Sequence, residues 1–97
     1  MSITLTPRER AQLKARAHAL EPVVQVGHAG LSESVAAELE RALAAHELIK
    51  VRIGADREAR AELAAAICAR TGAAQVQSVG KVLVLFRPSP DDEPADD

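Results

Sequence analysis

Two glycines three residues apart, Gly27 and Gly30, occur where a β-branched run gives way to a helical pattern. Glycine has no Cβ, so a turn built from it lets another molecule come close to the main chain. The first amides of a helix lack intrahelical partners and favour an anion. The stretch Gly27-His28-Ala29-Gly30 therefore predicts a loop that holds a phosphate group. The alternative is a tight strand-to-helix turn without a ligand.

Six basic residues are candidates to extend this loop into one positive surface, as binding to a nucleic-acid backbone requires. Three belong to the first predicted helix, two to a predicted strand and one to a predicted hairpin. They are Arg10, Lys14, Arg16, Lys50, Arg52 and Lys81. Lys50 and Arg52 are the most informative, because two cations on one face of a short strand are less easily dismissed than cations on a helix. For each residue alone, an ordinary solvated charge is the alternative.

The charge is unevenly distributed along the 97 residues. The net charge is −2, from 12 basic and 14 acidic residues. Residues 88–97, PSPDDEPADD, hold five of the acids and no base, so the rest carries 12 basic against nine acidic residues, a net charge of about +3. We expect one domain over residues 1–88 and a disordered acidic tail over 89–97. The tail either competes with RNA for the basic surface or only aids solubility.

Several classes of function are disfavoured by composition. Phe86 is the only aromatic residue, so the chain has no platform on which to stack bases, and nucleic acid must be bound mainly through backbone and shape. His18, His28 and His46 have no metal-ligand spacing with one another or with Cys68. No hydrolase, zinc-protease or P-loop motif is present. We expect no enzyme, no cofactor, no metal and no small-molecule substrate.

The compartment is predicted from what the chain contains. Apolar runs are interrupted by charges and none approaches the roughly 20 residues of a membrane span. A single cysteine, Cys68, has no partner for an intrachain disulfide. We therefore expect a protein of the reducing cytoplasm, without membrane association.

Caps and apolar periodicity predict the order helix, strand, helix, strand, helix, strand, strand. The expected ranges are 7–19, capped by Thr6, then 23–26, a helix from Ser32, 48–53, 57–70, 74–79 and 82–86. Strand–helix–strand units favour parallel pairing, and Gly80 favours a type II′ hairpin before an apolar, central last strand. The order indicates an α+β or α/β two-layer domain with a small mixed sheet.

Alternation along the strands assigns side chains to the two faces of this sheet. If the apolar residues face the helices, namely Val24, Ile49, Val51, Ile53 and Val76, the polar residues that alternate with them face the opposite side. These are Gln25, Lys50, Arg52, Gln75 and Gln77. We therefore expect one face of the sheet to remain partly open to solvent.

The runs PVVQVGHAGL, HELIKV and GKVLVLFRP together resemble the bacterial YhbY-type CRM domain proteins, over about Leu5 to Pro88. The resemblance implies a four-stranded fold similar to the C-terminal domain of translation initiation factor three. It implies RNA contact by the Gly27–Gly30 loop and neighbouring bases, and association with precursors of the large ribosomal subunit. Ala29 is inert where family loops often carry a polar residue, which leaves His28 and the main-chain amides as donors. The acidic tail is outside the family pattern.

We therefore predict a monomeric RNA-binding protein that holds structured ribosomal RNA through its phosphate backbone on precursors of the large subunit. The alternative is a protein-docking module on the ribosome or its assembly machinery.

Overall fold

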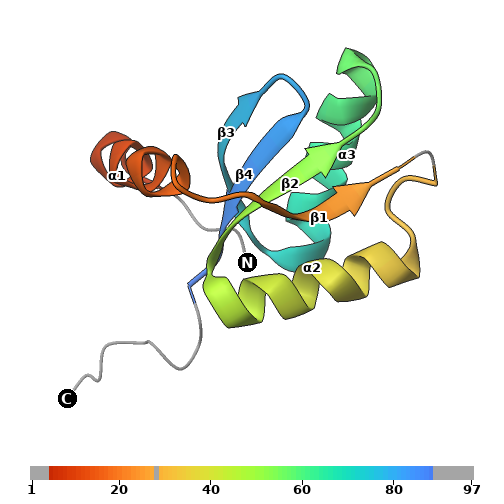
Figure 1. The fold of residues 1–97 in the computed structure, drawn as a ribbon, viewed down its shortest axis with the longest axis horizontal. Coiled ribbons are helices and arrows are strands. Elements are labelled where there is room, and N and C mark those ends of the chain that lie inside the picture. The colour runs from red at the N-terminus through yellow and green to blue at the C-terminus, as the bar shows by residue number, and fades with distance from the viewer. Residues whose placement is uncertain (1–4, 28, 89–97) are drawn as a thin grey trace.

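The computed structural model describes residues 5–27 and 29–88, which form three helices and four strands (Figure 1). The elements are α1 (Pro7–Ala17), β1 (Pro22–Val26), α2 (Glu33–His46), β2 (Leu48–Ile53), α3 (Arg57–Thr71), β3 (Ala74–Val79) and β4 (Val82–Phe86). The predicted order is confirmed. The first helix ends two residues earlier than expected, which places Leu20 in the linker before β1 with 36% of its surface exposed.

Helix starts and stops follow from single side chains. Thr6 and Glu9 form the predicted capping box, each side chain pairing with the main-chain amide of the other at 3.0 and 2.9 Å. Ser32 accepts from an amide in the first turn of α2, and Asp56 does the same for α3. Gly72 ends α3 in the left-handed conformation with φ 76°, as its position predicts.

The sheet has the strand order β1-β2-β4-β3. β1 and β2 are parallel, whereas β4 runs antiparallel to both β2 and β3. The apolar strand β4 is central, as its sequence predicted, and Gly80 adopts the positive φ of 57° that a type II′ hairpin requires at its first position. The α+β class and the four-stranded mixed sheet are confirmed.

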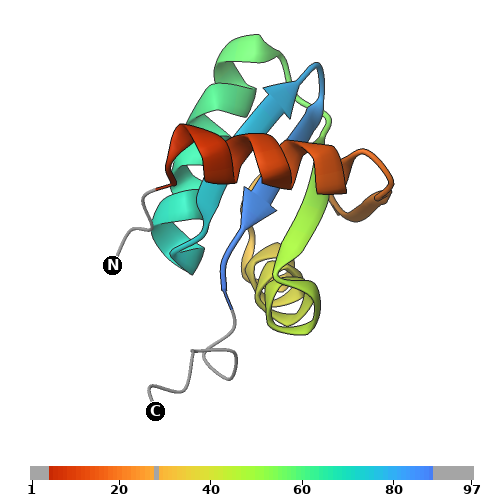
Figure 2. The same cartoon turned by 90° about the vertical axis from the view of Figure 1, so that its left-hand side faces the viewer.

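Helices cover both faces of the sheet rather than one, as Figure 2 shows for α1, which crosses in front of the strands. Leu39 and Leu43 of α2 and Ile67 of α3 pack with the sheet in the larger core cluster. Leu13 and Ala17 of α1 pack on the opposite face, against Leu48, Val76 and Val84. Only part of that face is covered: Arg52 and Gln25 on it are exposed. The open face expected from the sequence is therefore half occupied by α1.

The pairing of β3 with β4 is irregular between Gln75 and Gln77, where β3 has one more residue than the facing part of β4. This is a β-bulge. Strict alternation placed Val76 with Ile49 and Val51, and this was wrong. Gln75 lies opposite Leu85 and lines a hollow with residues of α3, so its expected place on the open face was also wrong. Val76, the next residue, faces α1, where it is 2% exposed. The expected alternation was therefore out of phase by one residue before the bulge, and the bulge then brings Gln77 back to the face that was expected for it.

Candidate nucleic-acid interface

One edge of the sheet gathers the predicted glycine loop and the hairpin. The parallel strands β1 and β2 end at the same edge, and the amide of Gly54, just after β2, donates to the carbonyl of Val26 at 3.0 Å. The antiparallel strand β4 begins there, so the amide of Ile53 donates to the carbonyl of Lys81 at 2.8 Å. The topology thus brings residues far apart in sequence to one side of the molecule.

The glycine turn is open to solvent. Gly27 and Ala29 are exposed, and the amide of Gly30 donates to the carbonyl of Gly27 at 3.0 Å. Gly30 has φ 71°, in the left-handed region that favours glycine, and a Cβ there would lie 3.5 Å from Leu63. Gly27 has open space around the corresponding position. His28, the predicted side-chain donor, lies outside the described residues.

The inner side of the glycine turn is not basic. Gly27, Gly30 and Gly54 border an open hollow whose other walls include the carboxylates of Asp56 and Glu62. These acids disfavour a phosphate inside the hollow. These acids leave the side of the turn that faces away from α3 as the more favourable approach for a phosphate group.

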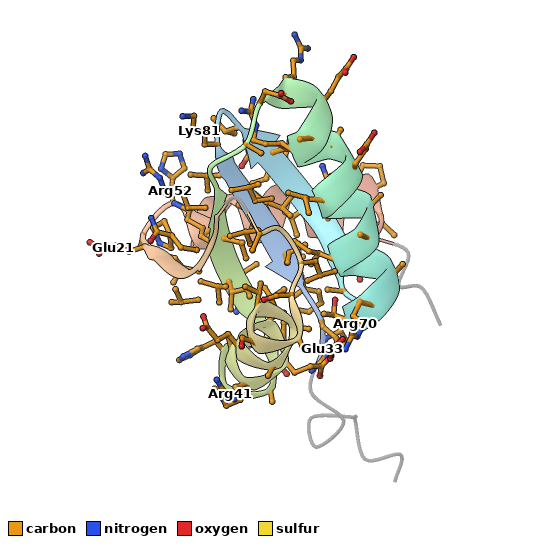
Figure 3. The ribbon with its side chains drawn as sticks, turned by 90° about the vertical axis from the view of Figure 1, so that its right-hand side faces the viewer. Glu21, Glu33, Arg41, Arg52, Arg70 and Lys81 are labelled. Atoms are coloured by element: carbon orange, nitrogen blue, oxygen red, sulfur yellow. The ribbon has the colours of Figure 1, made fainter. Side chains whose placement is uncertain are left out.

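The start of α2 also differs from a free anion site. The predicted cap Ser32 accepts from the amide of Val35 at 3.2 Å. Glu33, the first residue of the helix, pairs with Arg70 of α3 at 2.8 Å (Figure 3). The hydrogen bond and the positive charge of Arg70 hold the pKa of the Glu33 carboxyl below its usual range. A carboxylate thus already stabilises this helix end.

Lys14 and Lys50 meet in a groove between α1 and the uncovered half of the sheet. Lys14 of α1 lies one helical turn before His18, the residue that caps the end of this helix, and both line the groove. Lys50 reaches across from β2 and donates from Nζ to the carbonyl of Leu20 at 3.0 Å. An ammonium group has three donors, so this bond leaves the others available.

Arg52 and Lys81 continue the positive surface from this groove to the edge of the sheet. Arg52 follows Lys50 on the same face of β2 and is paired in the ladder with Val82, the residue after Lys81. Both side chains are exposed and project from the same side of the molecule (Figure 3). We call Lys14, Lys50, Arg52 and Lys81 the basic face.

Two of the six predicted cations do not belong to the basic face. Arg10 donates to the main-chain carbonyls of Gln75 and Val76, so its guanidinium holds α1 against the bulge of β3. Arg16 lies on another side of α1 and lines a separate hollow with Glu21 and His46. The predicted single surface is thus reduced to four residues, because Arg10 is engaged within the fold and Arg16 points elsewhere.

Sequence reasoning missed the role of Arg87, the arginine of the GKVLVLFRP run. Its guanidinium contacts both carboxylate oxygens of Glu40 at 3.0 Å and donates to the carbonyl of Thr71 at 2.8 Å. Arg87 therefore joins the end of β4 to α2 and α3. Its contacts lie 16 and 47 residues away, which local pattern does not reveal.

Within residues 5–27 and 29–88, no group of three or more histidine, cysteine or acidic residues is arranged to hold a metal ion. No helix in the same part of the chain is long and apolar enough to cross a membrane.

The chain is similar to known proteins of one family. An RNA-binding protein of Haemophilus influenzae is 53% identical over 87 residues, covering 89% of this chain and 88% of that protein. A probable RNA-binding protein of Pseudomonas aeruginosa is 44% identical over 89 residues, covering 91% and 86%. The solution structure of a Staphylococcus aureus protein, described as hypothetical and as a candidate RNA-binding protein, is similar with a TM-score of 0.80 and 28% identity, covering 93% of this chain and 95% of that one. The CRS1 / YhbY (CRM) domain model matches residues 5–87. The chain belongs to the CRS1 / YhbY (CRM) domain family.

Proposed function

We propose that this protein binds RNA through its phosphate backbone and that the basic face is the main contact. The observation that carries the proposal is the continuity of Lys14, Lys50, Arg52 and Lys81 across α1, β2 and the hairpin. Among residues 5–27 and 29–88, no carboxylate lines the groove that Lys14 and Lys50 share. Clustered cations of this kind neutralise phosphates and release counterions, which is the main source of affinity for a polyanion. The names of the relatives support the same ligand.

The glycine turn contributes main-chain contacts in this proposal. Gly27 is exposed and unobstructed, and it lies at the edge of the sheet where the hairpin with Lys81 also lies. RNA lying across the basic face would therefore meet the outer side of the turn. The predicted roles of Arg10 and Arg16 are not retained.

The ligand we infer is structured ribosomal RNA on precursors of the large ribosomal subunit, bound by a cytoplasmic monomer without catalytic activity. This part of the proposal rests on the resemblance to YhbY-type proteins. It agrees with the scarcity of aromatic residues, which favours contacts to phosphates and 2′-hydroxyls over stacking of successive bases. Crosslinking in cells, mapped to ribosomal RNA positions, tests it; crosslinks confined to other RNAs would contradict it.

A charge reversal tests the basic face directly. Arg52→Glu is expected to weaken binding to a ribosomal RNA fragment by at least about tenfold and to flatten the log–log salt dependence by about one unit of slope. Arg41→Glu is the matched control, since Arg41 is an exposed arginine of α2 far from Arg52 and the change in net charge is the same (Figure 3). Equal losses for the two variants would mean that overall charge, and not this surface, governs binding.

A second candidate function is docking to a ribosomal or assembly protein. The observation in its favour is a hollow beside the edge strand β1, lined in part by the exposed apolar residues Leu20 and Val23. Nuclease treatment of ribosomal particles distinguishes the two functions. Release of the protein with the digested RNA supports RNA binding, whereas retention on stripped particles supports docking.

A further inference from the structure

The groove that Lys14 and Lys50 share has an apolar part that a phosphate group would not contact favourably. Its floor is apolar and consists of Ala17 of α1 with Val79, Val82 and Val84 of the hairpin strands. Val79 is 58% exposed, more than any other large hydrophobic side chain among the residues that the structure describes. Phosphate gains nothing from aliphatic surface, whereas a flat uncharged ring gains from covering it.

The uncharged polar side chain of Gln77 lies beside this apolar floor. The bulge of β3 places Gln77 opposite Val84, so its amide joins Lys14 and Lys50 around the groove. A glutamine amide offers two donors and one acceptor oxygen, the groups that an unpaired base edge presents in complementary form. Without the bulge, strict alternation would give this position to Val76, which is instead buried under α1.

The size and charge of the groove limit its occupant. Its volume of about 330 Å³ is in the range of small-molecule sites. In the part of the chain that the structure describes, two ammonium groups and no carboxylate line it, which favours a ligand with negative groups on either side of a flat body. A base within a double helix is stacked and paired and cannot enter such a groove, whereas an unpaired base can be turned out of the chain.

We propose that this groove accepts the base of one unpaired RNA nucleotide. The aliphatic floor covers a face of the base, Gln77 hydrogen-bonds one of its edges, and Lys14 and Lys50 hold the phosphates that flank it. This inference rests on the proposed RNA binding and adds to it a preference for RNA with unpaired nucleotides. Because the amide of Gln77 can reorient, the site has no built-in choice of one base over the others.

The test compares single-stranded and fully paired RNA of the same sequence in salt titrations, with wild type and four variants. Val79→Ser and Gln77→Leu are expected to weaken binding of the single strand by about fivefold, with the salt slope unchanged because no phosphate contact is lost. Binding of the duplex is expected to stay as in wild type. The matched controls are Val23→Ser, a valine 52% exposed on the opposite edge strand, and Gln75→Leu, whose side chain lines a different hollow.

The outcomes distinguish a failure of the base-binding groove from a failure of the proposed binding to the RNA backbone. Loss confined to Val79→Ser and Gln77→Leu and to the single strand supports the inference. Equal losses on duplex and single strand, wild-type behaviour of both variants, or the same loss in the controls would overturn it while leaving backbone binding intact. A single strand with its bases removed keeps its phosphates, so it should bind wild type and Val79→Ser alike. A wild-type protein that binds neither RNA refutes the proposed function itself.

Discussion

Arg10 of α1 donates from its guanidinium to the main-chain carbonyl of Val76, 3.2 Å away and 66 residues later in the chain. A second bond from the same nitrogen reaches the carbonyl of Gln75. Both carbonyls belong to the bulge of β3, where the regular pairing with β4 is interrupted. A residue that resembled an RNA contact in the sequence thus stabilises the bulge that positions Gln77.

Replacing Arg10 by methionine is expected to destabilise the fold by about 1 kcal/mol, because hydrogen bonds from a charged donor are lost at a half-buried site. Urea unfolding measures the effect, with Arg8→Met, at an exposed position of the same helix, as control. The salt slope of RNA binding is expected to remain that of wild type. A flatter slope at unchanged stability would return Arg10 to the RNA-binding surface.

The two glycines of the turn are expected to respond differently to alanine. Gly30→Ala places a Cβ on a residue with φ 71° and 3.5 Å from Leu63, so it is expected to cost about 1 kcal/mol of folding stability. Gly27→Ala meets no atom within 4 Å and is expected to leave stability unchanged. If RNA approaches the main chain there, Gly27→Ala weakens RNA binding. Wild-type affinity in this variant would limit the turn to a structural role.

The Glu33–Arg70 pair predicts a pH dependence of stability. Because the folded-state pKa of Glu33 is depressed below the ordinary 4.5, the pair stabilises the fold above that pH and the contribution is lost as pH falls through the folded-state pKa. Glu33→Gln removes this titration. The difference in unfolding free energy between wild type and Glu33→Gln should shrink on acidification, and a difference that stays constant would contradict the pair's contribution. The effect is small because both side chains are exposed.

Arg87 is expected to matter for stability and not for RNA affinity. Arg87→Ala removes the bonds to Glu40 and to the carbonyl of Thr71, and we expect a loss of about 2 kcal/mol. Arg41→Ala, at an exposed position of α2, provides the control for the loss of a cation alone. Unfolding by denaturant measures both. An undiminished midpoint in Arg87→Ala would show that the linkage between β4 and the two helices is dispensable.

Removal of residues 89–97, which lie outside the described residues, tests the division into a domain and a tail. The shortened protein keeps every residue of the two described core clusters, so it is expected to unfold with the same midpoint as the full chain. RNA affinity at low salt distinguishes the two interpretations of the acidic segment. Tighter binding after removal means that it competes with RNA, and unchanged binding leaves it a solubilising role.

Local features of the fold were readable from the sequence because they depend on neighbouring residues. Thr6 with Glu9, Ser32, Asp56 and Gly72 each act within one helical turn, and all do what their positions predict. The alternation of Leu48–Ile53 likewise defines which side chains of β2 share a face. These signals need no knowledge of the rest of the chain.

The candidate site depended on relationships that no short stretch encodes. Which face α1 covers is decided by burial of Leu13 and Ala17 against strands far along the chain, and this separated Lys14 from Arg16. The bulge that brings Gln77 to the same face as Val76 is stabilised by Arg10 from the other end of the sequence. The helices, the strands and the number of cations available thus follow from local sequence. Which of these cations share a surface depends on the long-range packing of α1 and the sheet, and local propensity does not encode it.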